Sequence, residues 1–504
     1  MFKAGLLTIR RLRQSNEQVT TYRLKRTDTV PGPTGRRNGT WRDTPALWAA
    51  GWLLSAAWAG SFPLLSGLAT HRRWGLFAAM GYLLAAAVAA WAPGSRSRAA
   101  SALVALAGAV LLPLTVLVAT GQGQSEVAVI ERSADLLIHS GSPYHPDPRQ
   151  VEDFTPYLPG VALLGLPRVL LGATPLADAR LWCAAVLTGC LVAGRLVQRP
   201  RRRRSAGGRT GFGQAVGSGR TPFGRQTAHG RTGAGRLPGG RVAAGGSAGR
   251  RPVDGRPPFG PGLVALVASP VVALPLCVSG VDLPLTGACC LGLALAARGR
   301  PVATGLALAL ACSIKWSAWP ALPVALALLA AVHGRRPAVR CAVVCLAATA
   351  ALVLPVALVA PHEMAEQVLA FPTGRAAVPT PAGSPLPGRL LAGSGPAGWS
   401  TAVAMLAAGG AVLAVSLFLR PPASLVAAAD RLALGLTLAF SLAPAGRFGY
   451  LALPLVLVTW ARLAGPPGAR TRQTPTAQPG GGDSSALRPK TSGRSPQREP
   501  AGQP

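Results

Sequence analysis

Acidic residues are scarce in this chain. Its 504 residues include 17 Asp and Glu against 51 Lys and Arg, so the formal net charge is +34. Charged residues of both signs make up only 13% of the sequence, whereas hydrophobic residues make up 49% and the mean hydropathy is +0.35. This shortage of charge is typical of a polytopic membrane protein, and no polar segment has the composition of a soluble catalytic domain.

The sequence also lacks the spacings that bind metals or nucleotides. No nucleotide-binding motif, Ser/His/Asp triad spacing or metal-ligand cluster is present, and no CxxC or Cys/His pattern suits zinc. The eight cysteines all lie in or at the ends of apolar runs, so we interpret them as small core residues, with a disulfide between helices as the alternative. We therefore expect no metal and no cofactor.

Apolar residues fall in many runs of about 17–25, the length that a helix needs to cross roughly 30 Å of hydrocarbon. The runs that indicate spans are 46–68, 74–91, 99–120, 176–197, 337–360, 400–419, 423–442 and 448–463, and shorter runs broken by Pro and Gly fill residues 262–333. We predict an all-α, polytopic transmembrane helix bundle with an external amphipathic helix. The expected number of spans is about 12, or about 13 if residues 156–172 also cross.

Polar segments divide the chain into five parts. We predict a disordered cytoplasmic arm at 1–44, a first membrane module at 45–197 with an external acidic loop at 120–155, a disordered Arg/Gly-rich cytoplasmic insert at 198–261, a second membrane module at 262–465 with an external loop at 361–398, and a disordered cytoplasmic tail at 466–504. The first apolar run begins near Ala46, so we expect no cleavable signal peptide.

Positive charge sets the predicted orientation of this multi-pass protein in the cell membrane. Arginine is concentrated in the arm, the insert and the tail, and basic loops mark the cytoplasmic side. Counting spans from either terminus places the acidic loop outside, and the two counts agree only if residues 156–172 do not cross. The insert has almost no aromatic residues for stacking on bases, so we expect membrane lipids, and no nucleic acid, as its partner.

Six of the 17 carboxylates gather in the loop between residues 122 and 153. They are Glu126, Glu131, Asp135, Asp147, Glu152 and Asp153. Any soluble loop needs some charge, but this alternative does not account for so many of the chain's few acidic residues in one short segment. A carboxylate cluster beside a membrane face indicates chemistry on that face.

Residues 125–140 have helical periodicity, with Ser125 as a reasonable N-cap and a Gly-Ser-Pro stop signal after them. At roughly 100° per residue, Glu131 and Asp135 fall opposite a broad apolar face, so we expect both to be solvated. Glu126 falls within the apolar face, in the first turn. Partial burial raises a carboxylate pKa and the helix N-terminus lowers it, a balance that suits a general base. The alternative is a charge that complements the helix dipole.

Short motifs flank this helix and recur further along the chain. They are Glu126-Val-Ala-Val-Ile-Glu-Arg-Ser-Ala-Asp-Leu-Leu, Gly141-Ser-Pro-Tyr144, Tyr157-Leu-Pro-Gly160, Ser279-Gly-Val-Asp282, Cys312-Ser-Ile-Lys315-Trp-Ser-Ala-Trp-Pro320 and Arg447-Phe-Gly-Tyr450 followed by Pro454. Together they resemble the family 87 glycosyltransferases, multi-span GT-C enzymes that include polyprenol-phosphate-mannose-dependent α-mannosyltransferases. The resemblance covers roughly residues 99–465 apart from the insert, and Glu126 stands where the family commonly has Asp.

The resemblance implies an enzyme that transfers a hexose, with mannose favoured, from a polyprenyl-phosphate donor to a glycan or glycolipid acceptor on the outer face, with inversion. It implies Glu126 as the catalytic base. The implied substrate-binding residues are Glu131, Asp135, Tyr144, Tyr157, Asp282, Lys315, Arg447 and Tyr450. Chemistry agrees with two roles: an attacking hydroxyl needs a carboxylate to take its proton, and a departing phosphate needs a cation, which Lys315 and Arg447 supply without a metal.

Alternatives stay open for single residues and for the whole chain. Lys315, the only Lys in the span region, is either functional or a side chain that snorkels from a helix end. Asp282 pairs with a cation, orients the sugar or only forms a turn, and the loop 361–398 covers the site or merely connects two spans. The alternative functions are a transporter or flippase of polar or lipid-linked solutes, for which we find no internal repeat, and a catalytically inactive family member.

Overall fold

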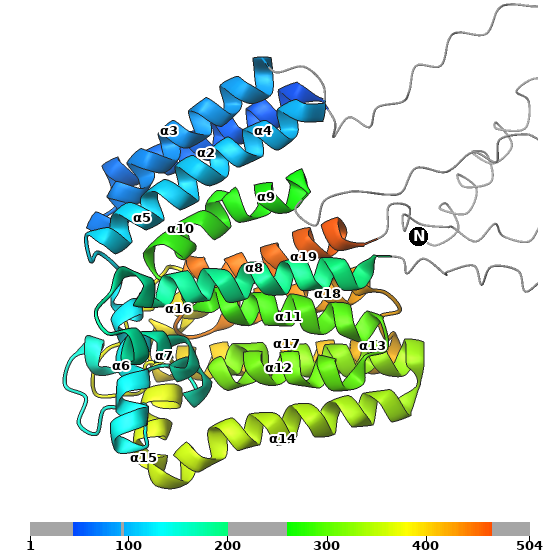
Figure 1. Cartoon of the computed structure of the whole chain (residues 1–504). Helices are drawn as coiled ribbons and strands as arrows, with labels where there is room; N and C mark the ends of the chain where they lie inside the picture. Colours follow the sequence, from blue (N-terminus) through cyan, green and yellow to red (C-terminus); the bar gives the residue numbers. More distant parts are fainter. Residues whose placement is uncertain (1–43, 92–94, 200–259, 466–504) are drawn as a thin grey trace, which may run out of the picture.

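The computed structural model describes residues 44–91, 95–199 and 260–465 (Figure 1). The predictions for the segments 1–44, 198–261 and 466–504 fall almost wholly outside these residues. In the described part, helices connected by short segments account for the fold, and the only β pairing there is an isolated bridge between Gly383 and Gly446. The predicted all-α class is confirmed.

The first membrane module contains the helices up to residue 198. They are α2 (Pro45–Leu65), α3 (Ala69–Trp91), α4 (Ser95–Leu106), η2 (Ala107–Leu111), α5 (Leu112–Ala119), α6 (Ser125–Ser140), η3 (Val151–Asp153), η4 (Pro159–Val161), α7 (Ala162–Leu171), η5 (Pro175–Ala177) and α8 (Ala179–Gln198).

The second module begins at residue 261. It contains α9 (Pro261–Ala268), α10 (Pro270–Val278), α11 (Asp282–Ala297), α12 (Pro301–Ile314), η6 (Trp316–Ala318), α13 (Ala321–His333), α14 (Arg335–Val359), α15 (Pro361–Met364), η7 (Ala365–Ala370), α16 (Pro387–Ala392), α17 (Pro396–Leu419), α18 (Leu425–Leu442), η8 (Phe448–Leu451) and α19 (Ala452–Ala464).

Seven of the described helices are long and apolar enough to cross a membrane. They are Ala69–Trp91, Arg96–Ala119, Ala179–Gln198, Trp316–His333, Arg335–Val359, Pro396–Leu419 and Leu425–Leu442, and the pair α9 and α10, bent by 55°, is an eighth if it forms one span. Four further apolar helices are only 10–17 residues long. The chain is therefore a helical membrane protein, but length and composition alone do not yield the predicted count of about 12.

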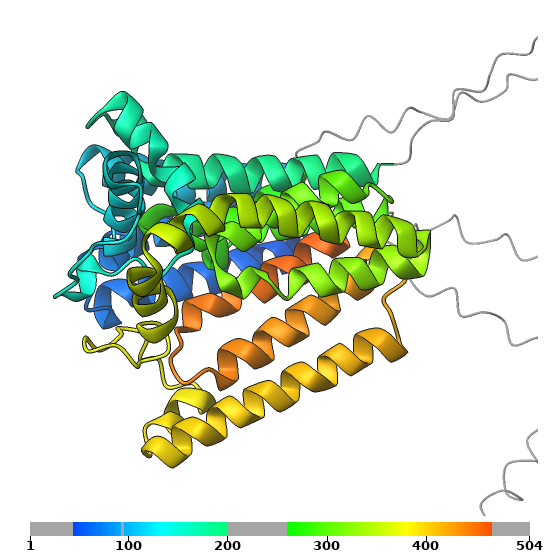
Figure 2. The same cartoon turned by 90° about the horizontal axis from the view of Figure 1, so that it is seen from below.

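The long helices run side by side, and α6 and α7 lie across one end of this bundle, which we call the α6 end (Figures 1 and 2). The last residues of α8, the turn after α11 and the turn after α13 meet at the opposite end. There Arg298 donates to the carbonyl of Gln198, and a ring nitrogen of His333 lies 3.3 Å from the carbonyl of Ala297. The two basic turns predicted to share one side of the membrane thus lie at the same end of the bundle.

The segment predicted not to cross, residues 156–172, forms η4 and α7 at the α6 end (Figure 1). Pro159 starts the first and Pro167 lies inside the second, and the two helices together cover only 13 residues. A Cβ on Gly165 would lie 2.3 Å from the carbonyl oxygen of Ile130, so glycine allows α7 to pack directly on α6. The segment thus packs along α6 at this end of the bundle.

Small residues allow close helix packing in the bundle interior. A Cβ on Gly81 of α3 would lie 2.6 Å from the Cα of Gly108 in η2. Beside this crossing, the indole of Trp74 donates to the carbonyl of Ala109 over 2.9 Å. The cysteines contribute to the same interior, since seven are buried, Cys190 is half-buried, and all eight are free thiols. The interpretation of the cysteines as core residues is confirmed.

Candidate functional site

Six of the predicted site residues meet at the α6 end of the bundle, although they come from five segments of the chain. They are Glu126, Tyr157, Asp282, Lys315, Arg447 and Tyr450, and we call this cluster the ion-pair site. Two ion pairs connect its charged members, Arg447 with Glu126 and Lys315 with Asp282. The fold therefore assembles most of the residues that the sequence motifs single out.

Lys315 lies where α12 ends and η6 begins. Its backbone is extended (φ −153°, ψ 138°), which interrupts the helix and turns the side chain into the site. The ammonium donates to Asp282 over 2.8 Å and lies 4.6 Å from the ring centre of Tyr450 and 5.3 Å from that of Tyr157. Only 12% of the side chain is exposed. The alternative of a snorkelling lysine is therefore wrong, because the ammonium is enclosed by a carboxylate and two aromatic faces.

Asp282 is the first residue of α11 and follows a tight turn at Gly280, whose φ of +76° favours glycine. A Cβ on Gly280 would also come within 3.2 Å of Cys183, so this turn is held closely against α8. Of the three roles considered for Asp282, pairing with a cation is the one that its position fits.

Glu126 and Arg447 are 321 positions apart in the chain and form a direct ion pair. Glu126 lies in the first turn of α6 beside the buried residues Val127, Val129 and Ile130, as its predicted position within the apolar face requires. Burial acts to lower the pKa of Arg447, but the coulombic effect of Glu126 and Tyr450 outweighs it and raises that pKa above the usual arginine value. The guanidinium therefore stays charged in the site.

The start of α6 differs from the prediction by one residue. The N-cap is Gln124 and not Ser125, and no side chain caps the helix. Gln124 instead donates its backbone N–H to the carbonyl of Val278 over 2.9 Å, and its amide nitrogen lies 2.7 Å from a ring nitrogen of His71. The predicted stop is confirmed, since Gly141 ends the helix with a φ of +76°. Tertiary contacts, and not a local cap, therefore fix the turn that carries Glu126.

The other three predicted binding residues, Asp135, Tyr144 and Glu131, lie outside the ion-pair site. Asp135 is 62% exposed and lies 3.3 Å from His139, so its predicted solvation is confirmed. Tyr144 is buried and donates to the carbonyl of Tyr157 over 3.0 Å, so its hydroxyl supports a site residue and does not face the site.

The predicted solvation of Glu131 is wrong. Only 18% of its side chain is exposed; it accepts from the backbone N–H of Ala179 over 3.2 Å and lies 3.3 Å from Arg168. Burial raises the pKa of Glu131, although Ala179 and Arg168 counteract part of this shift. The helical pattern of α6 gives no sign that α7 and the start of α8 cover this face, because that contact depends on the tertiary fold.

An apolar groove of about 1000 Å³ opens at the ion-pair site and runs between α13, α17 and α18. Tyr157, Lys315 and Tyr450 line it at the α6 end, and Arg335 and Arg431 line it at the opposite end. Most of its wall consists of Leu, Ala, Pro and Gly residues, largely from the three helices. Helix α17 lies on the outer side of the bundle (Figure 2), and Gly398 and Ala402 are its only buried residues.

The loop 361–398 contacts two of the segments that carry site residues. Buried Gln367 accepts from the N–H of Thr155 over 3.0 Å and donates to the carbonyl of His145 over 2.7 Å. Further along, the N–H of Ser384 donates to the carbonyl of Gly446, and the Ser384 hydroxyl accepts from the N–H of Phe448 over 3.2 Å. These bonds bracket Arg447, so the loop does more than connect two helices: it fixes the backbone of a site residue.

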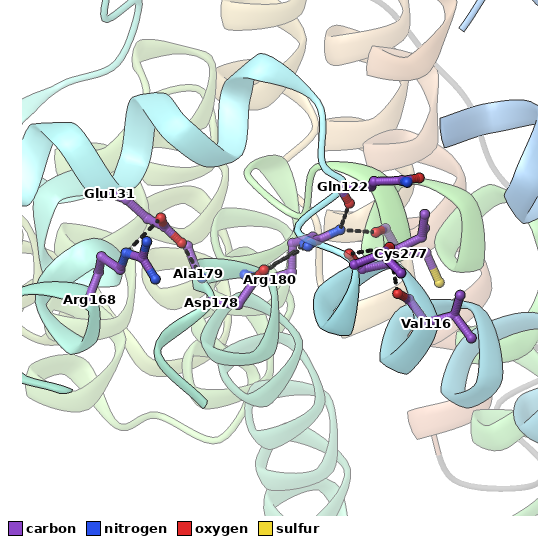
Figure 3. Close-up of polar contacts among 10 residues, drawn as sticks. Val116, Gln122, Glu131, Arg168, Asp178, Ala179, Arg180 and Cys277 are labelled. Carbon is purple, nitrogen blue, oxygen red and sulfur yellow. Dashed lines mark hydrogen bonds and ion pairs between the residues drawn. The ribbon is translucent and has the colours of Figure 1, made fainter. Parts of the chain in front are cut away.

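A second charged cluster, which none of the sequence motifs above includes, surrounds Arg180 (Figure 3). Both ends of its guanidinium bind Asp178, over 2.9 and 2.6 Å, and its remaining nitrogen donates to the carbonyls of Gln122 and Cys277 over 2.6 and 3.0 Å. Arg180 therefore connects the start of α8, the loop before α6 and the end of α10. The signal in the sequence was an Asp-Ala-Arg triplet at the start of an apolar run.

Among the residues that the structure describes, no three His, Cys, Asp or Glu side chains are arranged to hold a metal ion. Comparison of the chain with protein-family models, curated proteins and solved structures found no match.

Proposed function

We propose that this protein is an integral-membrane glycosyltransferase that moves a hexose, with mannose favoured, from a polyprenyl-phosphate donor to a glycan or glycolipid acceptor. The observation that carries the proposal is the apolar groove, which ends at Lys315 and Tyr450 of the ion-pair site. A lipid-linked sugar phosphate has a long apolar chain and an anionic head, and these match the groove and the ion-pair site respectively. The family resemblance supplies the identity of the sugar.

The two ion pairs define how such a donor binds. Glu126, Asp282, Lys315 and Arg447 together carry no net charge, and each cation holds a carboxylate. The phosphodiester of the donor carries one negative charge and competes for both cations. When the phosphate takes Arg447, Glu126 loses its partner and becomes free to accept a proton. The base is thus released only in the presence of donor.

Transfer then follows in one displacement. The acceptor hydroxyl gives its proton to Glu126 while its oxygen attacks the anomeric carbon, and the bond from that carbon to the phosphate oxygen breaks. The polyprenyl phosphate leaves with the bonding electrons, and Lys315 and Arg447 stabilise its added charge. Burial raises the pKa of Tyr157 well above its usual value, so its hydroxyl stays protonated beside the leaving group.

We also propose that the α6 end faces the outside of the cell membrane and that the chain crosses it about 12 times. The basic turns at 298–300 and 333–336 lie at the opposite end, which supports a cytoplasmic assignment for that end. The short helices α11 and α12 each run from a turn at one end of the bundle to a turn at the other end, which supports counting them as crossings.

A flippase or transporter of lipid-linked solutes is the second candidate. One observation favours it: the groove has cations at both ends, with Arg335 and Arg431 at the end away from Lys315. An anionic head group could bind at either end of such a groove. A catalytically inactive family member is the third, because Glu126 replaces the usual Asp.

The deciding experiment uses purified protein in lipid vesicles with radiolabelled polyprenyl-phosphate mannose and a soluble mannoside acceptor. We expect label to move to the acceptor, and to do so without added metal or nucleotide. A second arm measures movement of the same donor across the vesicle bilayer. Movement without transfer would replace the transferase by the flippase, and neither activity would leave the inactive family member.

A further inference from the structure

A polar cavity of about 460 Å³ lies on the other side of the α6 N-terminus from the ion-pair site. Its walls are the loop before α6, the first two turns of α6, α7, the segment around η5 and the start of α8. The charged side chains in these walls are Glu131, Arg168, Asp178 and Arg180 (Figure 3). We call this cavity the polar pocket. The proposed reaction leaves it without a role.

The charges of the polar pocket cancel in pairs. Arg168 lies 3.3 Å from Glu131, and Arg180 lies 2.6 Å from Asp178. An anion or a cation would gain little from such a neutral set, whereas a neutral ligand with many hydroxyl groups finds both strong donors and strong acceptors there. Paired carboxylate and guanidinium groups in a polar cavity therefore favour a carbohydrate.

The two pairs differ in how much hydrogen-bonding capacity they offer to a ligand. Arg180 is only 1% exposed and binds Asp178 and two carbonyls, so it forms the floor of the pocket. Arg168 is 38% exposed, contacts Glu131 through its Nε and lines the cavity. Arg168 and Glu131 are thus the side chains that a ligand meets first.

The polar pocket and the proposed base lie on different faces of the first turn of α6. Gln124, Ser125 and Val127 line the pocket, and Glu126 between them points to Arg447. At roughly 100° per residue, Glu131 lies about 140° around α6 from Glu126. A single sugar cannot meet both faces of a helix about 10 Å wide, but an acceptor of two or more sugars can lie over the N-terminal turn.

We propose that the polar pocket binds a neutral sugar of the acceptor, one or more residues away from the hydroxyl that reacts at Glu126. The assignment of that sugar to an acceptor rests on the proposed glycosyltransferase function. The binding of a neutral sugar in the pocket does not rest on that function, because binding needs neither the donor nor the transfer reaction.

The first test measures sugar binding without donor. Purified protein in nanodiscs is titrated with mannobiose and, separately, with inorganic phosphate, using ligand-observed NMR. We expect mannobiose to bind and Arg168→Gln to weaken it about 10-fold or more, as expected for one charge-assisted hydrogen bond. Arg149→Gln is the matched control, since Arg149 is an exposed arginine paired with Asp147 outside the pocket. Equal mannobiose affinity in Arg168→Gln and Arg149→Gln, or phosphate bound in preference to the sugar, overturns the proposal.

The second test places the pocket in the reaction. In a transfer assay, Arg168→Gln and Glu131→Gln should raise the KM for a disaccharide acceptor about 10-fold, while kcat and the donor affinity stay near wild type. A fall in kcat at unchanged acceptor KM contradicts the pocket as an acceptor site. If no variant transfers sugar but Arg168→Gln still loses mannobiose binding, the proposed function fails and the sugar site stands.

Discussion

The ion-pair site and the polar pocket lie on two faces of the same helical turn, and each contains two cations and two carboxylates. One cation of each, Arg180 in the pocket and Arg447 in the ion-pair site, shows a difference in how fully it is bound. Arg180 in the pocket is buried to 1% exposure and meets Asp178 and two carbonyls, whereas Arg447 in the ion-pair site is 37% exposed and meets Glu126. A saturated cation, whose hydrogen bonds are made to several protein groups, stabilises the fold. A cation with one exchangeable partner is able to bind a ligand instead.

Their surroundings also differ, and so do the ligands that they favour. The ion-pair site opens on an apolar groove, while the pocket is lined by two arginine–carboxylate pairs. A lipid phosphate suits the first and a hydroxyl-rich sugar suits the second. The α6 turn between them carries Glu126, whose side chain pairs with Arg447 in the ion-pair site. The variants below test whether the two regions are as different as their contacts indicate.

The largest effect is expected for Glu126→Gln. Gln keeps the size and hydrogen-bonding shape of the side chain but cannot take a proton, so transfer should fall by a factor of roughly 10² to 10⁴. Donor affinity should be kept or increased, because the carboxylate that competes for Arg447 is lost. Initial rates and donor binding in the same lipid preparation check both parts.

Asp135→Asn is the comparison on the same helix, since that side chain is 62% exposed and pairs with His139. It should keep near-wild-type transfer. Equal activity in Glu126→Gln would remove Glu126 as the base, and loss confined to Asp135→Asn would move the base to the opposite face of α6.

The next largest effect is on stability and separates the two arginines. Arg180→Met removes the guanidinium from Asp178 and from the carbonyls of Gln122 and Cys277, and leaves Asp178 only the backbone N–H of residue 180. We therefore expect a loss of about 3–5 kcal/mol in the free energy of unfolding. Arg447→Met removes a half-exposed partner and should cost about 1 kcal/mol or less. Thermal unfolding in nanodiscs measures both. Similar losses in the two variants would refute the distinction between a saturated and an exchangeable cation.

Lys315→Met tests the donor side with a smaller expected effect. Losing one charge-assisted hydrogen bond of about 1.5–3 kcal/mol should weaken donor binding by about 10- to 150-fold. Asp282→Asn should act in the opposite direction, because it removes the carboxylate that holds the ammonium in the absence of ligand. Donor binding weakened equally by both substitutions would mean that the Lys315–Asp282 pair serves the fold and not the phosphate.

The sequence predicted the fold class and the members of the ion-pair site for different reasons. Long apolar runs require helices in lipid, so the class follows from hydropathy alone. Glu126, Lys315 and Arg447 stood out because charge is rare in apolar surroundings, and their motifs resemble those of one enzyme family. The pairing of Glu126 with Arg447 does not follow from the sequence, which indicates a base at Glu126 and, separately, a phosphate-binding cation at Arg447.

Other features depend on contacts that no local pattern contains. A leucine of α17 that faces the groove and one that faces lipid look the same in sequence, so the groove was not predicted. The burial of Glu131 comes from α7 and from the N–H of Ala179, and the role of Arg180 comes from carbonyls of two other segments. Short helices such as α11 and α12 likewise make the number of spans depend on tertiary placement.

The smallest expected effect concerns the pH dependence of stability at Glu131. Burial raises the pKa of this carboxyl in the folded protein above its usual value near 4.3. The folded state therefore holds the proton more tightly than the unfolded chain, and this contribution is complete below the unfolded pKa and lost as the pH rises through the folded pKa. Gln cannot ionise, so the stability of Glu131→Gln relative to wild type should increase from pH 4 to pH 7, by about 1 kcal/mol or less.

Melting temperatures at several pH values in nanodiscs measure this difference, and Arg168→Gln sharpens it. Arg168 counteracts the effect of burial on Glu131. In an Arg168→Gln protein, the ionisation of Glu131 should therefore lower the free energy of unfolding by a larger amount over the same pH range. If Glu131→Gln instead becomes less stable than wild type as the pH rises, the ionised pair with Arg168 stabilises the fold. The exchangeable charges would then be confined to the ion-pair site, and Arg168, like Arg180, would belong to the structural framework.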